Sequence, residues 1–312
     1  MKNIVSRPVL TFLALLWLAF PTSSAHAQLL SATTTLPAPP QYKGTSNGSM
    51  NMVNGAPACT QLFQTKGYVP DIAGHETDRY PLFIYLNGSE LFAPTNYDAP
   101  APTAVAKAMA SRGFVALNPQ YDNTYFNPGS DDKAKCLFST FQAGNLLANA
   151  CQHPRVDCSK GVVVWGHSQG AQLAIKAANF AFTLDGKRLI RGVWAAGFGA
   201  ASFKVDLPRD RLRVVNGAQD LGNNDVTTLN ATTQLSCASN AQSCYRPNKS
   251  GWALVSFLWN TIGSDHCWFG GCSAAAGSAP LASGFSEGGN GEAWRLGVNA
   301  DWLASTIRSS WQ

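Results

Sequence analysis

The sequence has few charged residues and no repeat. Among its 312 residues, 13% are charged and 45% are hydrophobic. A disordered chain shows the opposite balance, and a fibrous chain shows a short period, so both classes are excluded. We expect one large globular domain, because single domains commonly reach this size.

Long apolar runs are also missing, except near the N-terminus. There, Lys2 and Arg7 precede the apolar run from Pro8 to Phe20, which leads to Ala25-His26-Ala27. This order is typical of a signal peptide with a small-residue cleavage site. The run is too short to span a membrane, which takes about 20 residues. We expect residues 1–27 to be removed, no membrane span, and a secreted or periplasmic protein.

Runs of basic residues are absent too. The formal net charge is +5 and falls to +3 once Lys2 and Arg7 are removed. The remaining cations are scattered along the sequence, whereas a nucleic-acid-binding protein needs a clustered basic face. No glycine-rich phosphate loop and no paired-histidine zinc motif occurs. We expect no nucleic-acid partner, no metal and no cofactor.

Cysteine, in contrast, is plentiful behind the signal peptide. An even number of cysteines in an exported chain favours disulfides. Zinc is the alternative, but no two cysteines have the two-residue spacing of a structural zinc site. The spacing pairs Cys237 with Cys244 and Cys267 with Cys272. The other four can pair in three ways, and the sequence does not choose: Cys59, Cys136, Cys151 and Cys158.

Short apolar runs alternate with helical patterns from about residue 80 onwards. Residues 28–58 are rich in Ser, Thr, Pro, Gly and Asn, so we interpret them as an arm or loop before a single domain at 59–312. Apolar strands that alternate with helices predict an α/β fold with a mostly parallel sheet and helices on both faces. The expected strands are 81–86, 114–117, 162–165, 193–196 and 212–215. The expected helices are 101–112, 137–150, 171–182, 252–262 and 300–307.

The pattern Gly-x-Ser-x-Gly occurs three times, centred on Ser46, Ser168 and Ser286. A nucleophilic serine in this pattern needs a strand before it and a helix after it, so that a sharp turn lifts its hydroxyl clear of the sheet. Ser46 lies in the polar N-terminal segment, and Ser286 lies in a Gly/Ser-rich loop close to the C-terminus. Only Ser168 follows an apolar strand and precedes a helical segment.

The residues around Ser168 carry a family resemblance. Val-Val-Trp-Gly-His-Ser-Gln-Gly-Ala, residues 163–171, resembles the nucleophile elbow of α/β-hydrolases, including secreted lipases, esterases and cutinases. The resemblance implies an α/β-hydrolase fold and a catalytic triad whose members follow in the order serine, acid, histidine.

A serine nucleophile needs a histidine base and an acid that orients it. His26, His75 and His153 precede the elbow, and we expect the side chain of His167 to leave the turn in another direction. His266 remains as the base.

For the acid, Asp220 follows the strand at 212–215, where the carboxyl end of the strand should open into the site. Asp225 in the same loop is the alternative. Asp206 and Asp210 precede that strand, and Asp265 is more typical of a loop residue.

The oxyanion that forms during acyl transfer needs two backbone N–H donors. Gln169, directly after the nucleophile, should supply one. The other should follow the early strand, where this chain has Asn87-Gly88-Ser89 in place of the His-Gly common in the family, and we assign it to Ser89.

These residues predict a secreted serine hydrolase that cleaves small or polymeric carboxylic esters: an esterase, a lipase or a polyester hydrolase. A serine peptidase on the same fold is one alternative, and a catalytically silent binding protein is another. We expect a monomer.

Only 51 residues separate Ser168 from Asp220, so a lid inserted there would be small. A segment closed by a Cys237–Cys244 disulfide could also cover the site. Tyr121, Trp268 and Phe269 are candidates for lining the substrate pocket.

Overall fold

The structure is a computed structural model. It describes residues 65–72, 74–89, 101–121, 123, 130–140, 145–183, 186–198, 207–220, 222–255, 266 and 295–307, and the backbone of residues 100 and 308. For the backbone alone it also describes 26–30, 40–42, 52–53, 56–57 and 59–62.

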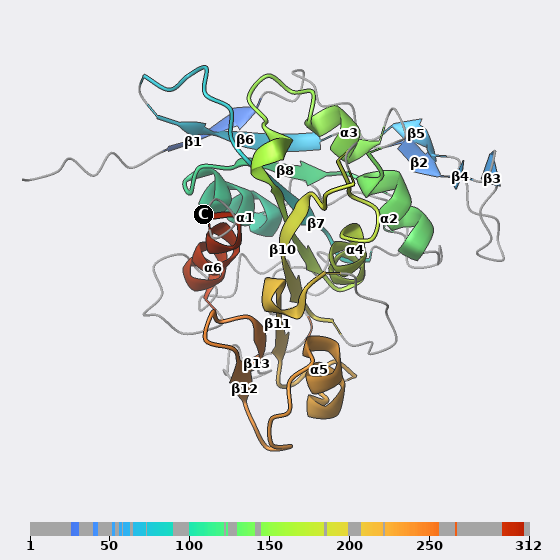
Figure 1. The fold of residues 1–312 in the computed structure, drawn as a ribbon, viewed down its shortest axis with the longest axis vertical. Coiled ribbons are helices and arrows are strands. Elements are labelled where there is room, and N and C mark those ends of the chain that lie inside the picture. Colours follow the sequence, from blue (N-terminus) through green and yellow to red (C-terminus); the bar gives the residue numbers. More distant parts are fainter. Residues whose placement is uncertain are drawn as a thin grey trace, which may run out of the picture.

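A nine-stranded sheet forms the centre of the molecule, with the order β1-β6-β8-β7-β9-β10-β11-β13-β12 (Figure 1). The pairs β1–β6, β6–β8 and β12–β13 are antiparallel, and the other five pairs are parallel. The bounds are β1 His26–Leu30, β6 Thr65–Asp71, β7 Leu82–Leu86, β8 Val115–Pro119, β9 Val162–His167, β10 Ile190–Ala196, β11 Leu212–Gly217, β12 Ser243–Tyr245 and β13 Gly251–Val255.

Helices cover both faces of this sheet. Helices α1 and α6 pack on one face, and α2, α3, α4 and α5 pack on the other (Figure 1). Their bounds are α1 Pro100–Ala110, α2 Ser130–Phe138, α3 Leu146–Ala150, α4 Gln169–Ala177, α5 Val226–Thr233 and α6 Leu296–Arg308. The expected α/β class, with a mostly parallel sheet between helices, is confirmed.

The strands are buried on both faces, as their sequences predict. All five residues of β7 and all six of β9 are buried. Alternate side chains enter two separate cores: Ile84 packs under α4, while Tyr85 packs under α1 and α6. On the latter face a row of aromatic rings crosses the sheet. Trp165 lies edge-on to Tyr85, with ring centroids 4.6 Å apart, and stacks on Trp194 at 4.4 Å.

The order of the strands reverses at β7. From β7 the chain passes through α1 to β8 on one side, and then returns through α2 and α3 to β9 on the other side of β7. The two connections use opposite faces of the sheet. Open α/β sheets bind ligands outside the carboxyl ends of the strands at such a reversal, which here are the ends of β7 and β9.

Two expected helices differ from the structure. The segment expected to be helical at 252–262 begins as strand β13. The prediction was wrong because a short apolar run is compatible with either a buried strand or a buried helix. Its remainder, 256–262, lies outside the described residues. The helix expected at 137–150 is two helices, α2 and α3, and Asn145 with an extended backbone stands between them.

The N-terminal segment contains short strands. Strand β1 pairs with β6 and crosses the predicted cleavage site after Ala27. Two small ladders pair β2 (Pro40–Tyr42) with β5 (Cys59–Leu62), and β3 (Met52–Val53) with β4 (Ala56–Pro57). This part of the predicted arm is therefore short strand rather than loop. The signal peptide stays a prediction, since residues 1–25 lie outside the described part of the chain.

Two disulfides close short loops of the chain. Cys237 pairs with Cys244, as predicted, and Cys151 pairs with Cys158, which is one of the alternatives left open. Cys136 is also disulfide-bonded. The predicted pair of Cys267 and Cys272 falls outside the described residues and stays a prediction.

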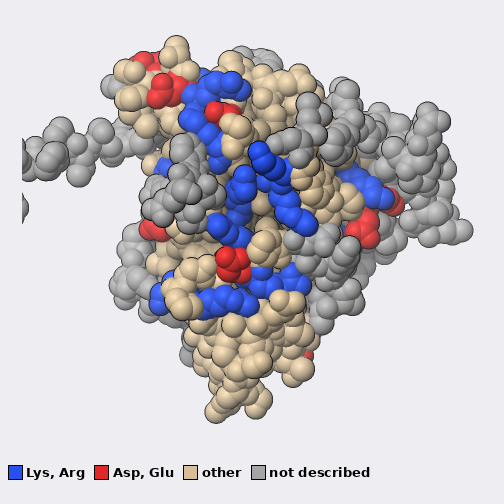
Figure 2. Space-filling view, in the orientation of Figure 1, with Lys and Arg blue, Asp and Glu red and all other residues tan. Residues whose placement is uncertain are grey.

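Cations gather at the amino ends of the parallel strands, although they are scattered in the sequence. Parallel strands all begin at one edge, and basic residues precede or open β7, β9, β10, β11 and β13: Arg79, Lys160, Arg188, Arg191, Arg209, Arg211 and Arg246. Figure 2 shows Lys and Arg side chains gathered over the middle of one face. Because these residues are far apart in the sequence, they form no run of basic residues.

Within the described part of the chain, no helix combines the length and the apolar character that a membrane crossing requires.

Candidate active site

Ser168 stands on the turn between β9 and α4, as the motif predicts. Its backbone has φ 54° and ψ −121°, a conformation that residues other than glycine rarely adopt. The Ser168 N–H donates to the Ala196 carbonyl at 2.9 Å, which ties the turn to the end of β10. Strain of this kind is retained where the surrounding structure holds it, and it occurs at functional sites.

The two motif glycines are required by close packing. A Cβ atom on Gly166 would lie 2.1 Å from the carbonyl oxygen of Gly170. A Cβ atom on Gly170 would lie 2.2 Å from the carbonyl oxygen of Leu86, at the end of β7. Both positions therefore exclude a side chain. The same contact places the loop after β7 directly against the start of α4.

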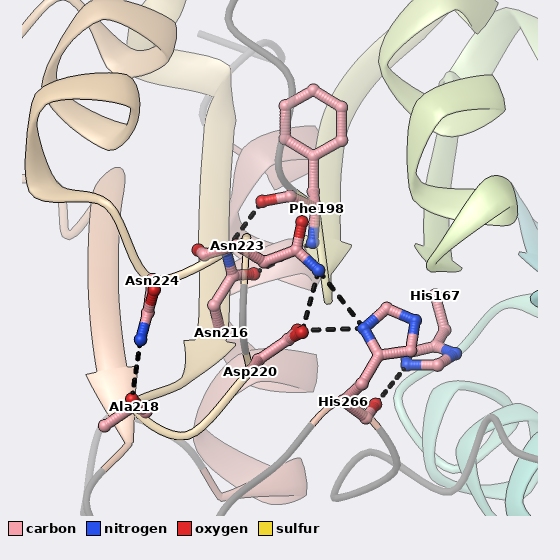
Figure 3. A network of polar contacts seen from close by, with 8 residues as sticks. All are labelled: His167, Phe198, Asn216, Ala218, Asp220, Asn223, Asn224 and His266. Carbon is pink, nitrogen blue, oxygen red and sulfur yellow. Dashed lines mark hydrogen bonds and ion pairs between the residues drawn. The ribbon is translucent and has the colours of Figure 1, made fainter.

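Asp220 and His266 are brought together although 46 residues separate them. The Nδ1 of His266 lies 2.9 Å from Asp220 Oδ2 (Figure 3). Because an ionised carboxylate only accepts hydrogen bonds, Nδ1 carries the proton, and Nε2 is left as the basic nitrogen. The Asp220 side chain is 3% exposed and that of His266 is 35% exposed. The Asp220 carboxylate is thus buried behind the partly exposed ring of His266.

The other candidate acids are used elsewhere or lie outside the described residues. The carboxylate of Asp225 accepts hydrogen bonds from the N–H groups of Thr227 and Thr228 and caps α5. Asp210 is exposed in the 3-10 turn before β11. Asp206 and Asp265 are not described.

An asparagine network that sequence reasoning missed holds the acid loop. Asn223 Nδ2 donates to Asp220 Oδ1 at 2.8 Å, so each carboxylate oxygen has its own donor (Figure 3). Asn223 Nδ2 also lies 3.2 Å from His266 Nδ1, but both atoms carry protons, so the carboxylate is the acceptor. Asn216 is fully buried and donates from Nδ2 to the carbonyls of Phe198 and Asn223.

The side chain of His167 packs against His266, a contact that sequence reasoning missed. The ring centroids of His167 and His266 are 4.8 Å apart, and His167 Nε2 lies 2.7 Å from the backbone oxygen of His266. Burial lowers the pKa of His167 to about 3, and the neighbouring His266 lowers it further. His167 is therefore neutral at ordinary pH. Sequence reasoning could not find this contact, because 99 residues separate the two partners.

The loop after β7 has its peptide groups fixed by two side chains. The Tyr121 hydroxyl donates to the Asn87 carbonyl, and Asn123 Nδ2 donates to the Gly88 carbonyl at 2.6 Å. In a trans peptide the N–H points opposite to the C=O. The Ser89 N–H therefore points away from Asn123. Tyr121, a candidate pocket residue, is buried and contacts this loop.

Gln169 begins α4, where backbone N–H groups have no partner within the helix. Its side-chain Oε1 accepts from Nζ of Lys133 at 3.1 Å. Lys133 is 1% exposed, and burial lowers its pKa to about 7. A buried lysine thus reaches the residue that follows Ser168.

The described residues include no hydrogen bond from the Ser168 hydroxyl to His266. Contacts between a nucleophile and its base often tighten only in the substrate complex. In the same part of the chain, no group of three His, Cys, Asp or Glu side chains could hold a metal ion.

Comparison with known proteins gives little further information. No family model matches the chain, and no curated protein matches it. Among solved structures, the chain is similar to the crystal structure of vibralactone cyclase, with 19% sequence identity and a TM-score of 0.33. The match covers 44% of this chain and 39% of that one, so the chain spans about two fifths of that protein. A likeness of this extent does not identify a family.

Proposed function

We propose that the chain is a secreted serine hydrolase of the α/β-hydrolase fold that cleaves carboxylic esters through an acyl-enzyme on Ser168. The observation that carries the proposal is the Asp220–His266 hydrogen bond, formed at the sheet edge where Ser168 occupies a strained strand–helix turn. The chain order serine, acid, histidine is the order of that superfamily. The disulfides Cys151–Cys158 and Cys237–Cys244 support export, because they persist in oxidising compartments.

In the proposed reaction, the Ser168 oxygen attacks the ester carbonyl carbon while Nε2 of His266 takes the hydroxyl proton. Asp220 holds the imidazole through Nδ1 and stabilises the imidazolium that forms. The imidazolium then gives the proton to the leaving alcohol oxygen as the ester C–O bond breaks. A water molecule repeats the sequence on the acyl-enzyme, releasing the carboxylic acid and restoring Ser168.

The negative charge that develops on the carbonyl oxygen requires donors fixed in advance. The backbone N–H of Gln169 comes from the first turn of α4, whose amino end carries partial positive charge. Ser89 N–H is the second proposed donor, supported by the contacts that hold the Gly88 peptide. Preorganised donors of this type contribute about 2.7–4 kcal/mol each to the stabilisation of the transition state.

Labelling with a fluorophosphonate probe tests the nucleophile. The native protein should be labelled and Ser168→Ala should not. Ser46→Ala and Ser286→Ala are matched controls, because both serines have the same pentapeptide pattern, and both variants should label normally. Absence of labelling in the native protein would reject the hydrolase and favour a catalytically silent binding protein with this fold.

Turnover of a short-chain nitrophenyl ester against a matched peptide anilide tests the substrate class. We expect the higher kcat/KM on the ester, and a higher value on the anilide would make the protein a peptidase. Asp220→Asn should lower kcat roughly a thousandfold or more, while Asp225→Asn should leave it unchanged. The reverse result would move the role of the acid to Asp225.

A further inference from the structure

His167 lies inside the nucleophile motif, yet the reaction proposed above makes no use of it. It is 1% exposed and carries two ring nitrogens into the interior. Burying a polar ring destabilises a protein unless the ring nitrogens form hydrogen bonds. A hydrophobic residue at this position would avoid the loss of stability. The presence of His167 therefore needs an explanation from the contacts that it makes.

One of those contacts reaches the main chain of the base. His167 Nε2 lies 2.7 Å from the backbone oxygen of His266. Because a carbonyl only accepts, Nε2 carries the proton and donates it. The two rings pack with centroids 4.8 Å apart (Figure 3). His266 is thus held through its backbone by His167 and through its ring by Asp220.

Gly197, which follows β10, lies close to both histidine rings. Gly197 has φ 59°, and a Cβ atom there would lie 3.0 Å from His167 Nε2 and 3.0 Å from His266 Cε1. Both imidazole rings therefore lie close to the main chain of Gly197, directly after β10, with no side chain between them and that main chain.

We propose that His167 is a positioning residue: its Nε2–H holds the backbone of His266 and so sets the base beside the neighbouring Ser168. This inference rests on the proposed function. The physical reason is proximity in the chain. Since His167 and Ser168 are joined by one peptide bond, a single hydrogen bond couples the position of the base to that of the nucleophile. A displacement of 1 Å at such a site can lower the rate about a hundredfold.

Two variants of nearly the same shape isolate the hydrogen bond. Gln in His167→Gln can place an amide N–H near the former Nε2, whereas Met in His167→Met has similar length and no donor. We expect His167→Met to lower kcat about tenfold to a hundredfold with KM within about twofold. His167→Gln should retain kcat within about threefold. His153→Met is the control, because this half-buried histidine lies outside the site and should not affect kcat.

A measurement that needs no activity separates this inference from the proposed function. In the native protein labelled with ¹⁵N-histidine, NMR should show His167 as the neutral tautomer protonated at Nε2 and His266 protonated at Nδ1. The His266 Nδ1–H signal should persist in His167→Gln and broaden or disappear in His167→Met.

Equal kcat in the Met, Gln and native proteins would overturn the positioning role, as would a His167 protonated at Nδ1. A native protein that shows these NMR signals but hydrolyses no ester would instead reject the proposed function and leave the hydrogen bond standing. If the Met variant does not fold, a native His167 protonated at Nδ1 still overturns the inference.

Discussion

The burial of His167 predicts how the stability of the protein changes with pH. Its pKa is lowered from 6.5 to about 3 in the folded state, because burial penalises the charged ring. In the unfolded chain the ring takes up a proton once the pH falls below about 6.5. Between these values the unfolded state binds the extra proton, so the free energy of unfolding decreases as the pH falls. The stabilising contribution is fully present above pH 6.5 and is lost towards pH 3.

The magnitude follows from the size of the pKa shift. Each pH unit within the window contributes about 1.4 kcal/mol, so the change from pH 7 to pH 4 is about 3 kcal/mol. Urea unfolding of the native protein and of His167→Gln at both pH values isolates the contribution of His167 to the pH dependence of stability, because the other titrating groups are common to both proteins. The difference in unfolding free energy between the two proteins should change by about 3 kcal/mol between pH 7 and pH 4. A change below about 1 kcal/mol would refute the neutral, buried state of His167.

Three further predictions concern the surroundings of the site. Asp225→Ala should lower the free energy of unfolding by about 1 kcal/mol through loss of the α5 cap, with kcat unchanged, and a large loss of kcat would contradict the role of Asp225 as a cap only. Gly197→Ala should lower kcat more than it raises KM, because the new methyl group presses on both histidines, and its kinetics are compared with those of the exposed Gly186→Ala. The double variant Cys267→Ser/Cys272→Ser should lose turnover more than melting temperature, because the predicted small loop next to His266 contributes little chain entropy. Peptide mapping under non-reducing conditions that found both thiols free would reject this pair.

The layered fold was predictable because its signals are local. Apolar runs such as 162–165 are short and bounded by turn residues, so their burial on both faces of a sheet can be inferred from the sequence. The turn at Ser168 was also predictable, because strand, turn and helix follow one another within a few residues. Strand β13 was not, because a short apolar run fits a strand as well as a helix, and only its pairing with β11 decides.

The surroundings of the candidate site were less accessible from the sequence. His167 contacts a residue 99 positions away, and Tyr121 contacts a carbonyl 34 positions away. Neither pair has a motif that links its members. Asn216 and Asn223 are ordinary loop or strand-end residues in the sequence, and only the folded loop turns their amides towards the acid and the chain around it. The roles of Ser168, Asp220, His266 and the two backbone donors remain predictions for the experiments above.

The stacked Trp165 and Trp194 give the protein an internal optical reporter. Trp165 immediately precedes Gly166, and the two indoles are fully buried at a centroid distance of 4.4 Å with 15° between their planes. Indoles held rigidly in such a pair produce a near-ultraviolet circular dichroism signal that disappears when tertiary packing is lost. The signal originates on the α1/α6 face of the sheet, and Trp165 stands three residues before Ser168 on β9. A variant that keeps this spectrum while losing turnover has kept the packing of β9 and β10, so its defect lies in the alignment of the groups at the candidate site.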